Sequence, residues 1–395
     1  MTTNRVLKLY PGDDQPEGEF SLGEVPSVKK APHEKIKIVG VGGGGNNALD
    51  HIIRNGITDV EILGVNTDLR CLEKCLAPDK LILGEKLTKG LGAGARPEVG
   101  TQAALESRED IRAALKGCDM VYLAAGMGGG TGTGAMPVIA NIAKELGILT
   151  VAVVTRPFTF EGKKRRQYAD EGIDKLAGIV DALLVVPNDR LLELSERTTS
   201  LSEAFSMADG VLRQAVKGVT DLITRAGFIN VDFADLRNVM QHAGPAVMGL
   251  GSASGEDRLQ TALKRAMESP LMECSMRGAK GVLFNITSSQ DMGIVEVQSA
   301  ANVLREYLDP EAHYIWGWVQ DDNAGDTVQV VLIATGLDHA DASPKPASPP
   351  KPERAANEQF AEAFDPSDTG MGIITDGDSE FDTPSYLRRR RDQRQ

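Results

Sequence analysis

The glycine-dense segment 126–134, GMGGGTGTG, is the feature that most limits what this chain can fold into. The apolar run at 120–125 directly before it is typical of a buried strand. After it, apolar residues recur at helical spacing, and Pro137 stands where a helix can take up its first turn. The segment therefore joins a buried strand to a helix, which is the repeating unit of an α/β fold.

The chemistry of this segment suits a phosphate group. Glycine has no side chain and tolerates positive φ, so its backbone N–H groups can approach an anion closely. The helix N-terminus adds unpaired N–H groups and a positive dipole, and Thr131 and Thr133 add hydroxyl donors. No Gly-Lys-Ser/Thr follows, which excludes a P-loop, and the protein-kinase motifs are absent. A merely flexible turn is disfavoured because a strand and a helix flank the glycines so closely.

Two further glycine loops are placed to join this phosphate cradle. A strand at 36–41 leads into Gly42 to Gly45 and then Asn46 and Asn47, before a helix that starts at Ala48. The loop 89–97 can close over a terminal phosphate. In a parallel sheet such turns fall at the carboxyl ends of the strands, where nucleotides bind. The pattern also predicts strands at 60–66, 81–83, 148–154 and 182–186, and a helix over 98–116.

A long helix is predicted over 200–224. Ser200 and Glu203 fit a capping box, and an apolar stripe at steps of three and four follows. Phe205 is most simply a core residue on this stripe. Asp209 lies near the same face and needs a partner, which guanine supplies because its N1–H and N2 amino group both donate and a carboxylate accepts two hydrogen bonds.

Acidic residues follow this helix. Asp232 is placed to cap the next helix, and Asp235 lies three residues later. Capping explains one aspartate well, but the two acids with Asn230 can also hold and polarise an attacking water. Glu161 and Arg165 share a helical face, as a solvated surface ion pair would also do.

After about residue 240 the pattern of predicted strands and helices changes. Strands at 281–286, 314–319 and 327–333 surround helices near 257–268 and 297–307, which predicts a smaller α+β domain. Beyond it, 338–380 has no apolar period, and 381–391 sets Phe381, Tyr386 and Leu387 beside four arginines, as in a peptide that orders on a partner.

Composition excludes several classes of function. The net charge of −13 argues against a general nucleic-acid binder. No apolar run reaches membrane-spanning length. The four cysteines are dispersed without a histidine cluster, so we interpret them as reduced thiols and predict no protein-held metal site: Cys71, Cys75, Cys118 and Cys274.

Seven segments together resemble one family over about 36–336: GVGGGGNN (40–47), NTD (66–68), KGLGAGA (89–95), GMGGGTGTG (126–134), PFTFEGKKR (157–165), PND (187–189) and NVDFAD (230–235). This order is similar to the tubulin/FtsZ family, and to its bacterial cell-division members more than to tubulins. The resemblance implies a tubulin-like α/β fold, in which a Rossmann-like parallel-sheet GTPase domain is joined by a long central helix to a smaller α+β domain. The domains we expect are an extension (1–34), the GTP-binding domain (35–199), the central helix (200–225), the α+β domain (226–336), a linker (337–380) and a partner-binding peptide (381–395).

The same resemblance implies roles for individual residues. Glu161 and Arg165 would contact ribose and phosphate, and Ala93, Gly94 and Ala95 would lie near the γ-phosphate. Asn188 and Asp209 would read guanine while Phe205 stacks on the base, and Asn230, Asp232 and Asp235 would act on the GTP of a neighbouring subunit. Arg96 stands where many members carry asparagine. The implied phosphate-binding residues are Gly43, Gly44, Gly45, Asn46, Asn47, Gly130, Thr131, Gly132 and Thr133.

The implied function is a cytoplasmic GTPase that binds GTP or GDP with Mg²⁺ and polymerises head to tail into the division ring at mid-cell. Its partners would be copies of itself and, through 381–391, membrane-tethering and regulatory division proteins. Two other hypotheses compete. A dinucleotide-dependent oxidoreductase needs an acidic ribose ligand about twenty residues after the first glycine turn, and Glu61 lies near that position. A scaffold that does not hydrolyse its nucleotide would lack the acids at 232 and 235.

Overall fold

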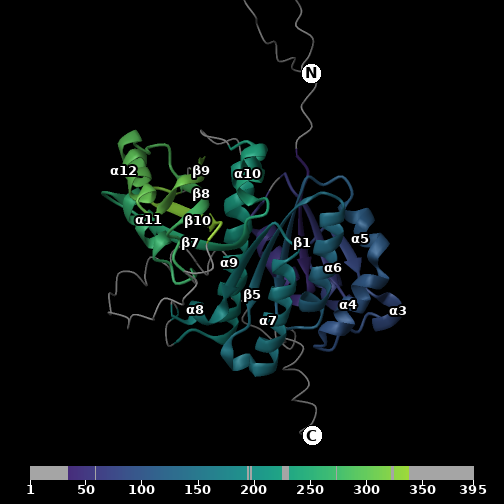
Figure 1. The fold of residues 1–395 in the computed structure, drawn as a ribbon. Coiled ribbons are helices and arrows are strands. Elements are labelled where there is room, and N and C mark those ends of the chain that lie inside the picture. The colour runs from purple at the N-terminus through teal and green to yellow at the C-terminus, as the bar shows by residue number, and fades with distance from the viewer. Residues whose placement is uncertain are drawn as a thin grey trace, which may run out of the picture. The chain divides into compact units, whose positions relative to one another are not determined.

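A ten-stranded sheet organises the computed structural model, with strand order β3-β2-β1-β4-β5-β6-β7-β10-β8-β9 (Figure 1). The structure describes residues 34–57, 59–193, 195, 198–224, 231–272, 274–321 and 324–337. The strands are β1 (Ile36–Val41), β2 (Glu61–Asn66), β3 (Asp79–Ile82), β4 (Met120–Gly126), β5 (Leu149–Arg156), β6 (Ala182–Pro187), β7 (Gly244–Ala253), β8 (Ala279–Ser288), β9 (Leu308–Gln320) and β10 (Val328–Thr335).

Helices cover both faces of this sheet within the described residues. In chain order they are α1 (Gly42–Arg54), α2 (Leu69–Lys74), α3 (Glu85–Thr88), α4 (Pro97–Glu106), α5 (Arg108–Leu115), α6 (Thr131–Glu145), α7 (Lys163–Ala177), α8 (Asn188–Leu192), α9 (Leu201–Thr224), α10 (Phe233–Met240), α11 (Arg258–Met267) and α12 (Ile294–Arg305), with a 3₁₀ turn at Thr159–Glu161.

The first half of the sheet is parallel and buried on both faces. Strands β3 to β6 pair parallel throughout, and β4 shows how one strand serves two cores. Its Tyr122 packs in the cluster that includes α1 and α9, while Leu123 packs on the other face with α6. A strand covered on both faces reads as a continuous apolar run, which is why the sequence predicted these strands.

Strand β7 connects the two halves, and the sequence pattern did not predict it. It pairs parallel with β6 and antiparallel with β10, so one sheet continues into the C-terminal region. Its glycines interrupt the apolar pattern, but packing requires them. A Cβ on Gly249 or Gly251 would overlap the carbonyl oxygens of Ala266 and Ala262, because α11 lies directly on this strand.

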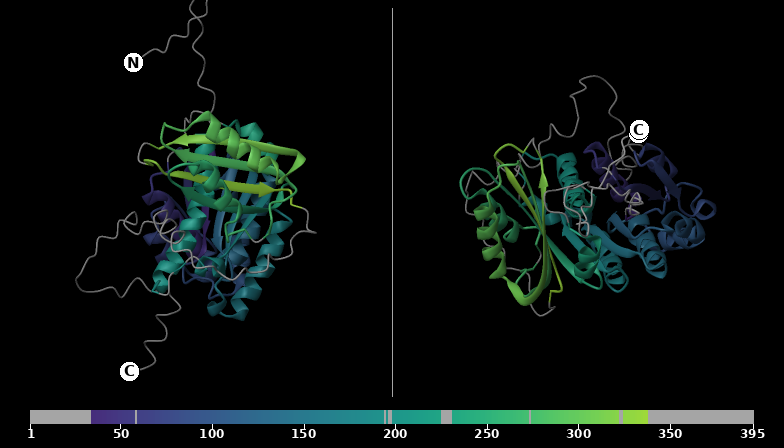
Figure 2. Two further views of the ribbon diagram at one scale, coloured as in Figure 1. Left: turned by 90° about the vertical axis from the view of Figure 1, so that its left-hand side faces the viewer. Right: turned by 90° about the horizontal axis from the view of Figure 1, so that it is seen from above.

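The C-terminal strands carry helices on one face and α9 on the other (Figure 2). Leu283 and Ile333 belong to the core that contains α9, whereas Phe284 and Leu332 pack with α11 and α12. The predicted long helix is confirmed, with the capping box between Ser200 and Glu203. Helix α9 also touches β8 directly, since the Asn285 side chain donates to the Gly218 carbonyl at 2.8 Å.

Two expectations about helix boundaries were wrong. The single helix expected over 98–116 is two helices, α4 and α5, which meet at Ser107, where the Ser107 hydroxyl accepts a hydrogen bond from the Gly84 amide. Helices α1 and α6 begin at Gly42 and Thr131, earlier than expected. Pro137 therefore lies inside α6 rather than in its first turn. The glycines after β1 and several of those after β4 therefore lie in the first turns of α1 and α6, where their backbone N–H groups belong to the helix N-termini.

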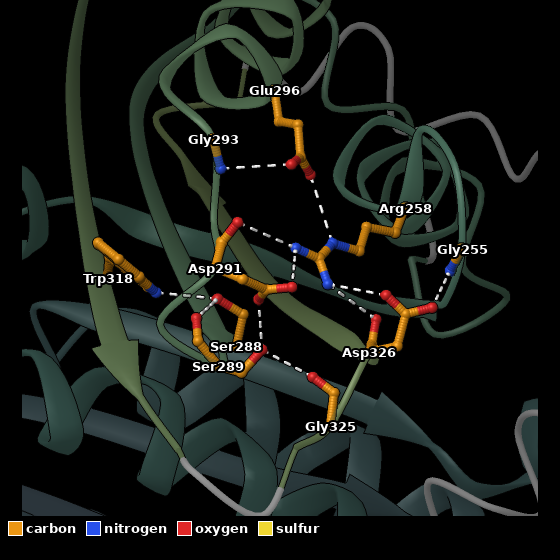
Figure 3. A network of polar contacts seen from close by, with 10 residues as sticks. All are labelled: Gly255, Arg258, Ser288, Ser289, Asp291, Gly293, Glu296, Trp318, Gly325 and Asp326. Atoms are coloured by element: carbon orange, nitrogen blue, oxygen red, sulfur yellow. Dashed lines mark hydrogen bonds and ion pairs between the residues drawn. The ribbon is translucent and has the colours of Figure 1, made fainter.

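A buried arginine ties together three loops at one end of the C-terminal strands (Figure 3). Arg258, only 5% exposed, is ion-paired with Asp326 at 2.9 Å, Asp291 at 3.1 Å and Glu296 at 3.4 Å. Asp291 and Glu296 belong to the connection from β8 into α12, and Asp326 precedes β10. One guanidinium at the start of α11 therefore fixes two other connections that are far apart in sequence.

Replacing this arginine should weaken the fold measurably. We expect Arg258→Ala to lower the free energy of unfolding by about 2 kcal/mol, because three carboxylates then lose their shared charged donor. Urea unfolding followed by circular dichroism measures the change. Arg112→Ala, which removes a partly exposed arginine paired with the exposed Glu145, is the matched control and should leave the midpoint unchanged. Equal midpoints for both variants would contradict the structural importance of Arg258.

Candidate active site

Three helix N-termini converge at the carboxyl edge of the parallel strands. A Cβ on Gly42, at the start of α1, would lie 2.9 Å from the backbone nitrogen of Gly132 in α6. A Cβ on Gly130, which caps α6, would lie 2.9 Å from the nitrogen of Arg96, the residue before α4. None of the three helices has a side-chain cap at this end. The unpaired N–H groups at the starts of α1 and α6, together with the dipoles of all three helices, therefore favour an anion at this place.

Glycine is required here by close packing of backbone on backbone. A Cβ on Gly45 would overlap the Ala124 carbonyl oxygen, and one on Gly132 would lie 2.7 Å from the Gly126 oxygen. Gly44 similarly approaches Gly126. Gly43 is different, because it is exposed and no atom lies within 4 Å of the place a Cβ would take. The predicted loops 42–47 and 126–134 are therefore brought together, with an open side at Gly43.

The third glycine loop is held against the same place by β2 and α6. The Gly92 amide donates to the Thr67 carbonyl at 3.0 Å, and the Thr67 and Thr131 hydroxyls share a 2.7 Å hydrogen bond. Ala93 is buried, and a Cβ on Gly130 would lie 2.8 Å from its Cβ. Gly94 and Ala95 follow with left-handed φ of 60° and 58° and are exposed. The loop is thus a fixed wall of the site.

Two buried asparagines at this edge of the sheet carry unpaired polar atoms. Asn46 is 3% exposed, and neither its Nδ2 nor its Oδ1 has a hydrogen-bond partner. Asn188, which starts α8 at the end of β6, is 5% exposed with an unpaired Oδ1. Leaving such groups unsatisfied costs about 1–3 kcal/mol each, so they point to a polar ligand. Asn47, one residue on, is exposed.

The carboxyl group of Asp209 on α9 has a raised pKa. Burial first, and the nearby charge of Asp50 second, raise the pKa of Asp209 to about 8. Phe205, one helical turn earlier, is half-buried and meets Phe158 and Phe160 edge-on, with ring centroids 5.4 and 6.5 Å away. These two rings were not among the predicted site residues, although both belong to the PFTFEGKKR motif.

The Glu161–Arg165 pair is present and is not a solvated surface pair. The Glu161 side chain is 7% exposed, bonds Arg165, and accepts a hydrogen bond from the Phe158 amide at 3.0 Å. Asp189 was missed as a positioning residue. It accepts from the Thr159 amide at 2.8 Å and pairs with Arg166 at 3.1 Å, so it ties the turn before α7 to α8.

Asp232 and Asp235 lie at the opposite edge of the sheet. Asp232 caps α10 by accepting from the Ala234 amide at 2.8 Å, and both acids are exposed. Arg237 of α10 donates to the carbonyl of Asp119, the residue before β4. The seven residues of β4 span about 23 Å before the cradle begins, so the acids cannot reach their own chain's glycine loops (Figure 1). Asn230 lies outside the described residues.

Within the described part of the chain, no three acidic, histidine or cysteine side chains converge on a metal position. Over the same residues, no helix combines the length and apolar character that spanning a bilayer demands. The four cysteines are free thiols.

Comparison with known proteins identifies the fold and the family. Residues 35–196 match the model of the Tubulin/FtsZ family GTPase domain, and 244–338 match the C-terminal domain of the FtsZ family. An empty FtsZ dimer from M. jannaschii is 42% identical, with 80% of this chain and 95% of that chain covered and a TM-score of 0.75. CetZ2 from Haloferax volcanii, 19% identical over 84% of this chain and 99% of that one with a TM-score of 0.66, shares the fold.

The molecule is thus a nucleotide hydrolase with a tubulin-like fold, made of a mostly parallel sheet covered by helices. The chain belongs to the tubulin/FtsZ family and is a GTPase of the FtsZ type, which is a filament-forming, cell-division class. The predicted family, fold class and activity are confirmed, and the oxidoreductase hypothesis is excluded. The similar FtsZ structures come from M. jannaschii, so a bacterial host stays a prediction.

Proposed function

We propose that GTP lies along the carboxyl edge of the parallel strands, from β6 to β2. The convergence of three uncapped helix N-termini carries this proposal, because it supports phosphate binding at Gly43, Gly44, Gly45, Gly130, Thr131, Gly132 and Thr133. The unpaired Asn46 amide and the unpaired Asn188 Oδ1 support polar contacts to the nucleotide on either side of the cradle. From β6 to β2 is four strand spacings, about 19 Å, which leaves room for base, ribose and phosphates in sequence.

The base would lie at the β6 end. Asp209 and Asn188 then read guanine, and Phe205 offers an aromatic face beside Phe158 and Phe160. Glu161 and Arg165 contact ribose and phosphate from the turn that Asp189 holds. Ala93, Gly94 and Ala95 form the wall at the β2 end, beside the terminal phosphate.

The active site is completed by a second copy of the chain. Asp232 and Asp235, with Asn230, lie at the edge opposite the cradle, so head-to-tail stacking sets one subunit's acids over the next subunit's GTP. That contact joins two different surfaces and does not close, so it builds a filament. The acids hold and polarise the attacking water, and hydrolysis weakens the polymer. The M. jannaschii FtsZ, which is 42% identical, was solved as a dimer, and this supports self-association of the chain.

The filament would serve as the division ring at the septum, at mid-cell in the cytoplasm. Membrane-tethering and regulatory division proteins would bind residues 381–391, which lie outside the described part of the chain. Mg²⁺ would neutralise phosphate charge. The described residues bring no three candidate metal ligands together, which fits a cation held mainly by phosphate oxygens and water.

Activity should depend on protein concentration. If each active site needs two subunits, phosphate release per subunit is near zero in dilute solution and rises steeply once filaments form. Phosphate release measured over a concentration series, beside light scattering, tests this. Electron microscopy with GTP and then GDP should show filaments that disappear. A constant rate per subunit at all concentrations would disprove the shared site.

A further inference from the structure

Arg96 occupies a special place at the β2 end of the site. It directly precedes Pro97, the first residue of α4, and its nitrogen and oxygen would lie 2.9 and 3.1 Å from a Cβ on Gly130. The residue is therefore packed by its backbone against the N-cap of α6, at the point where the three helix N-termini converge. The positive charge of its side chain and the dipoles of the three helices therefore attract an anion to the same place.

The backbone of Arg96 is held by hydrogen bonds, whereas its side chain makes none with the residues that the structure describes. Its amide donates to the Ala93 carbonyl at 3.2 Å, and its carbonyl accepts from the Val99 and Gly100 amides at 3.1 and 3.3 Å. Gly94 and Ala95 before it hold left-handed φ values, a conformation that costs Ala95 about 1 kcal/mol. The loop is thus tightly turned in a way that sets where the side chain begins.

The Arg96 guanidinium makes no hydrogen bond or ion pair with the residues that the structure describes, and it is exposed. Three arginines from the β5 end of the same edge are already paired with carboxylates: Arg156 with Asp170, Arg165 with Glu161 and Arg166 with Asp189. Arg96 therefore offers positive charge to a ligand without first having to break a protein ion pair. Its planar fork suits two oxygens of one phosphate group.

The order of the strands decides which phosphate it meets. Asn188 begins α8 directly after β6, the glycine loops follow β1 and β4, and the 89–96 loop is bonded to Thr67 after β2. A nucleotide whose base lies at β6 extends its phosphates towards β2, so the last phosphate comes nearest to Arg96. We propose that Arg96 contacts the terminal phosphate and makes the site prefer GTP to GDP. This inference rests on the proposed binding mode.

The test compares GTP and GDP affinities in the full-length chain. Below the concentration at which it assembles, wild type should bind GTP more tightly than GDP. Arg96→Ala should weaken GTP about 10- to 100-fold and GDP less than about 2-fold, as expected for loss of charge-assisted bonds to one phosphate. Arg96→Lys should keep part of the preference, since it keeps the charge but not the fork. Lys264→Ala, which removes an exposed charge from α11, should change neither affinity.

Each other outcome overturns the proposal in a recognisable way. Equal weakening of GTP and GDP would mean that Arg96 holds the loop rather than the terminal phosphate. Unchanged affinities with assembly shifted to higher protein concentration would place Arg96 at the contact between subunits instead. If the wild-type chain bound neither nucleotide, the proposed binding mode itself would fail, and the comparison of variants would not be needed to show it.

Discussion

Asp235→Ala is expected to bind GTP like the wild type but to lose at least about 100-fold in turnover. The acid lies at the edge of the sheet opposite the glycine loops, so its removal leaves the nucleotide site of its own subunit intact. In the proposed shared site, what disappears is the carboxylate that acts as general base towards the attacking water, a contribution of about 10²- to 10⁴-fold in general. Nucleotide affinity by fluorescence titration and phosphate release at high protein concentration separate the two effects.

Asp235 is the better variant because Asp232 also caps α10. Asp232→Ala removes the hydrogen bond from the Ala234 amide and costs about 1 kcal/mol of helix stability. A lower turnover in that variant could therefore reflect lost stability as well as lost catalysis. Filaments of Asp235→Ala should form with GTP and persist, since GTP is not consumed. A variant that kept wild-type turnover would show that the acids are not catalytic.

Mixing two inactive variants gives the sharpest form of this test. Asp235→Ala subunits keep a cradle, whereas subunits altered at Asp209 keep the acids but bind GTP poorly. A mixture contains contacts in which intact acids meet bound GTP, so activity should return although each variant alone is inactive. A site contained within one subunit cannot be restored by mixing, and failure to recover activity would favour that arrangement.

The parts of the fold that the sequence predicted share a physical cause. Parallel strands that are buried on both faces appear in the sequence as apolar runs, and α9 appears as an apolar stripe that begins with a capping box at Ser200. For these elements the local sequence pattern is sufficient to predict the structure. Strand β7 left no such signal, because Gly249 and Gly251 are dictated by the approach of α11, which is distant in sequence. The starts of α1 and α6 were missed for a related reason, since glycine within a helical turn looks like a loop.

The site shows the same division. Glycines could be predicted because their chemistry is local, but the unpaired state of Asn46 and Asn188 depends on what surrounds them in three dimensions. Asp189 and the Phe158–Phe160 pair lie inside recognised motifs, yet their roles come from contacts to residues on other elements. The separation of Asp235 from the cradle likewise follows from the length of β4, and sequence order alone does not give it.

Asp209→Asn is expected to weaken GTP binding about 100- to 1,000-fold and to reverse base preference. In the proposed binding mode guanine donates from N1 and N2 to the carboxylate, and the net contribution of about 1.5–3 kcal/mol for a hydrogen bond to a charged acceptor sets the scale of the loss. The asparagine amide supplies a donor in place of an acceptor, which suits the C2 oxygen of xanthine. Competition between GTP and xanthosine triphosphate measures this change, and an unchanged preference would mean that Asp209 does not read the base.

The pKa of about 8 at Asp209 adds a pH dependence to the same prediction. The folded-state pKa lies above the ordinary 3.8, so the free site holds a proton at neutral pH and the nucleotide-free fold loses stability as pH rises from about 4 to about 8. Guanine requires the ionised carboxylate, so binding releases that proton and affinity should rise with pH up to about 8, approaching tenfold per unit well below it. Asp209→Asn cannot ionise, and this component of the slope should vanish in it. Calorimetry in buffers of different ionisation enthalpy counts the released proton directly. Equal proton release by wild type and variant would assign the titration to another group.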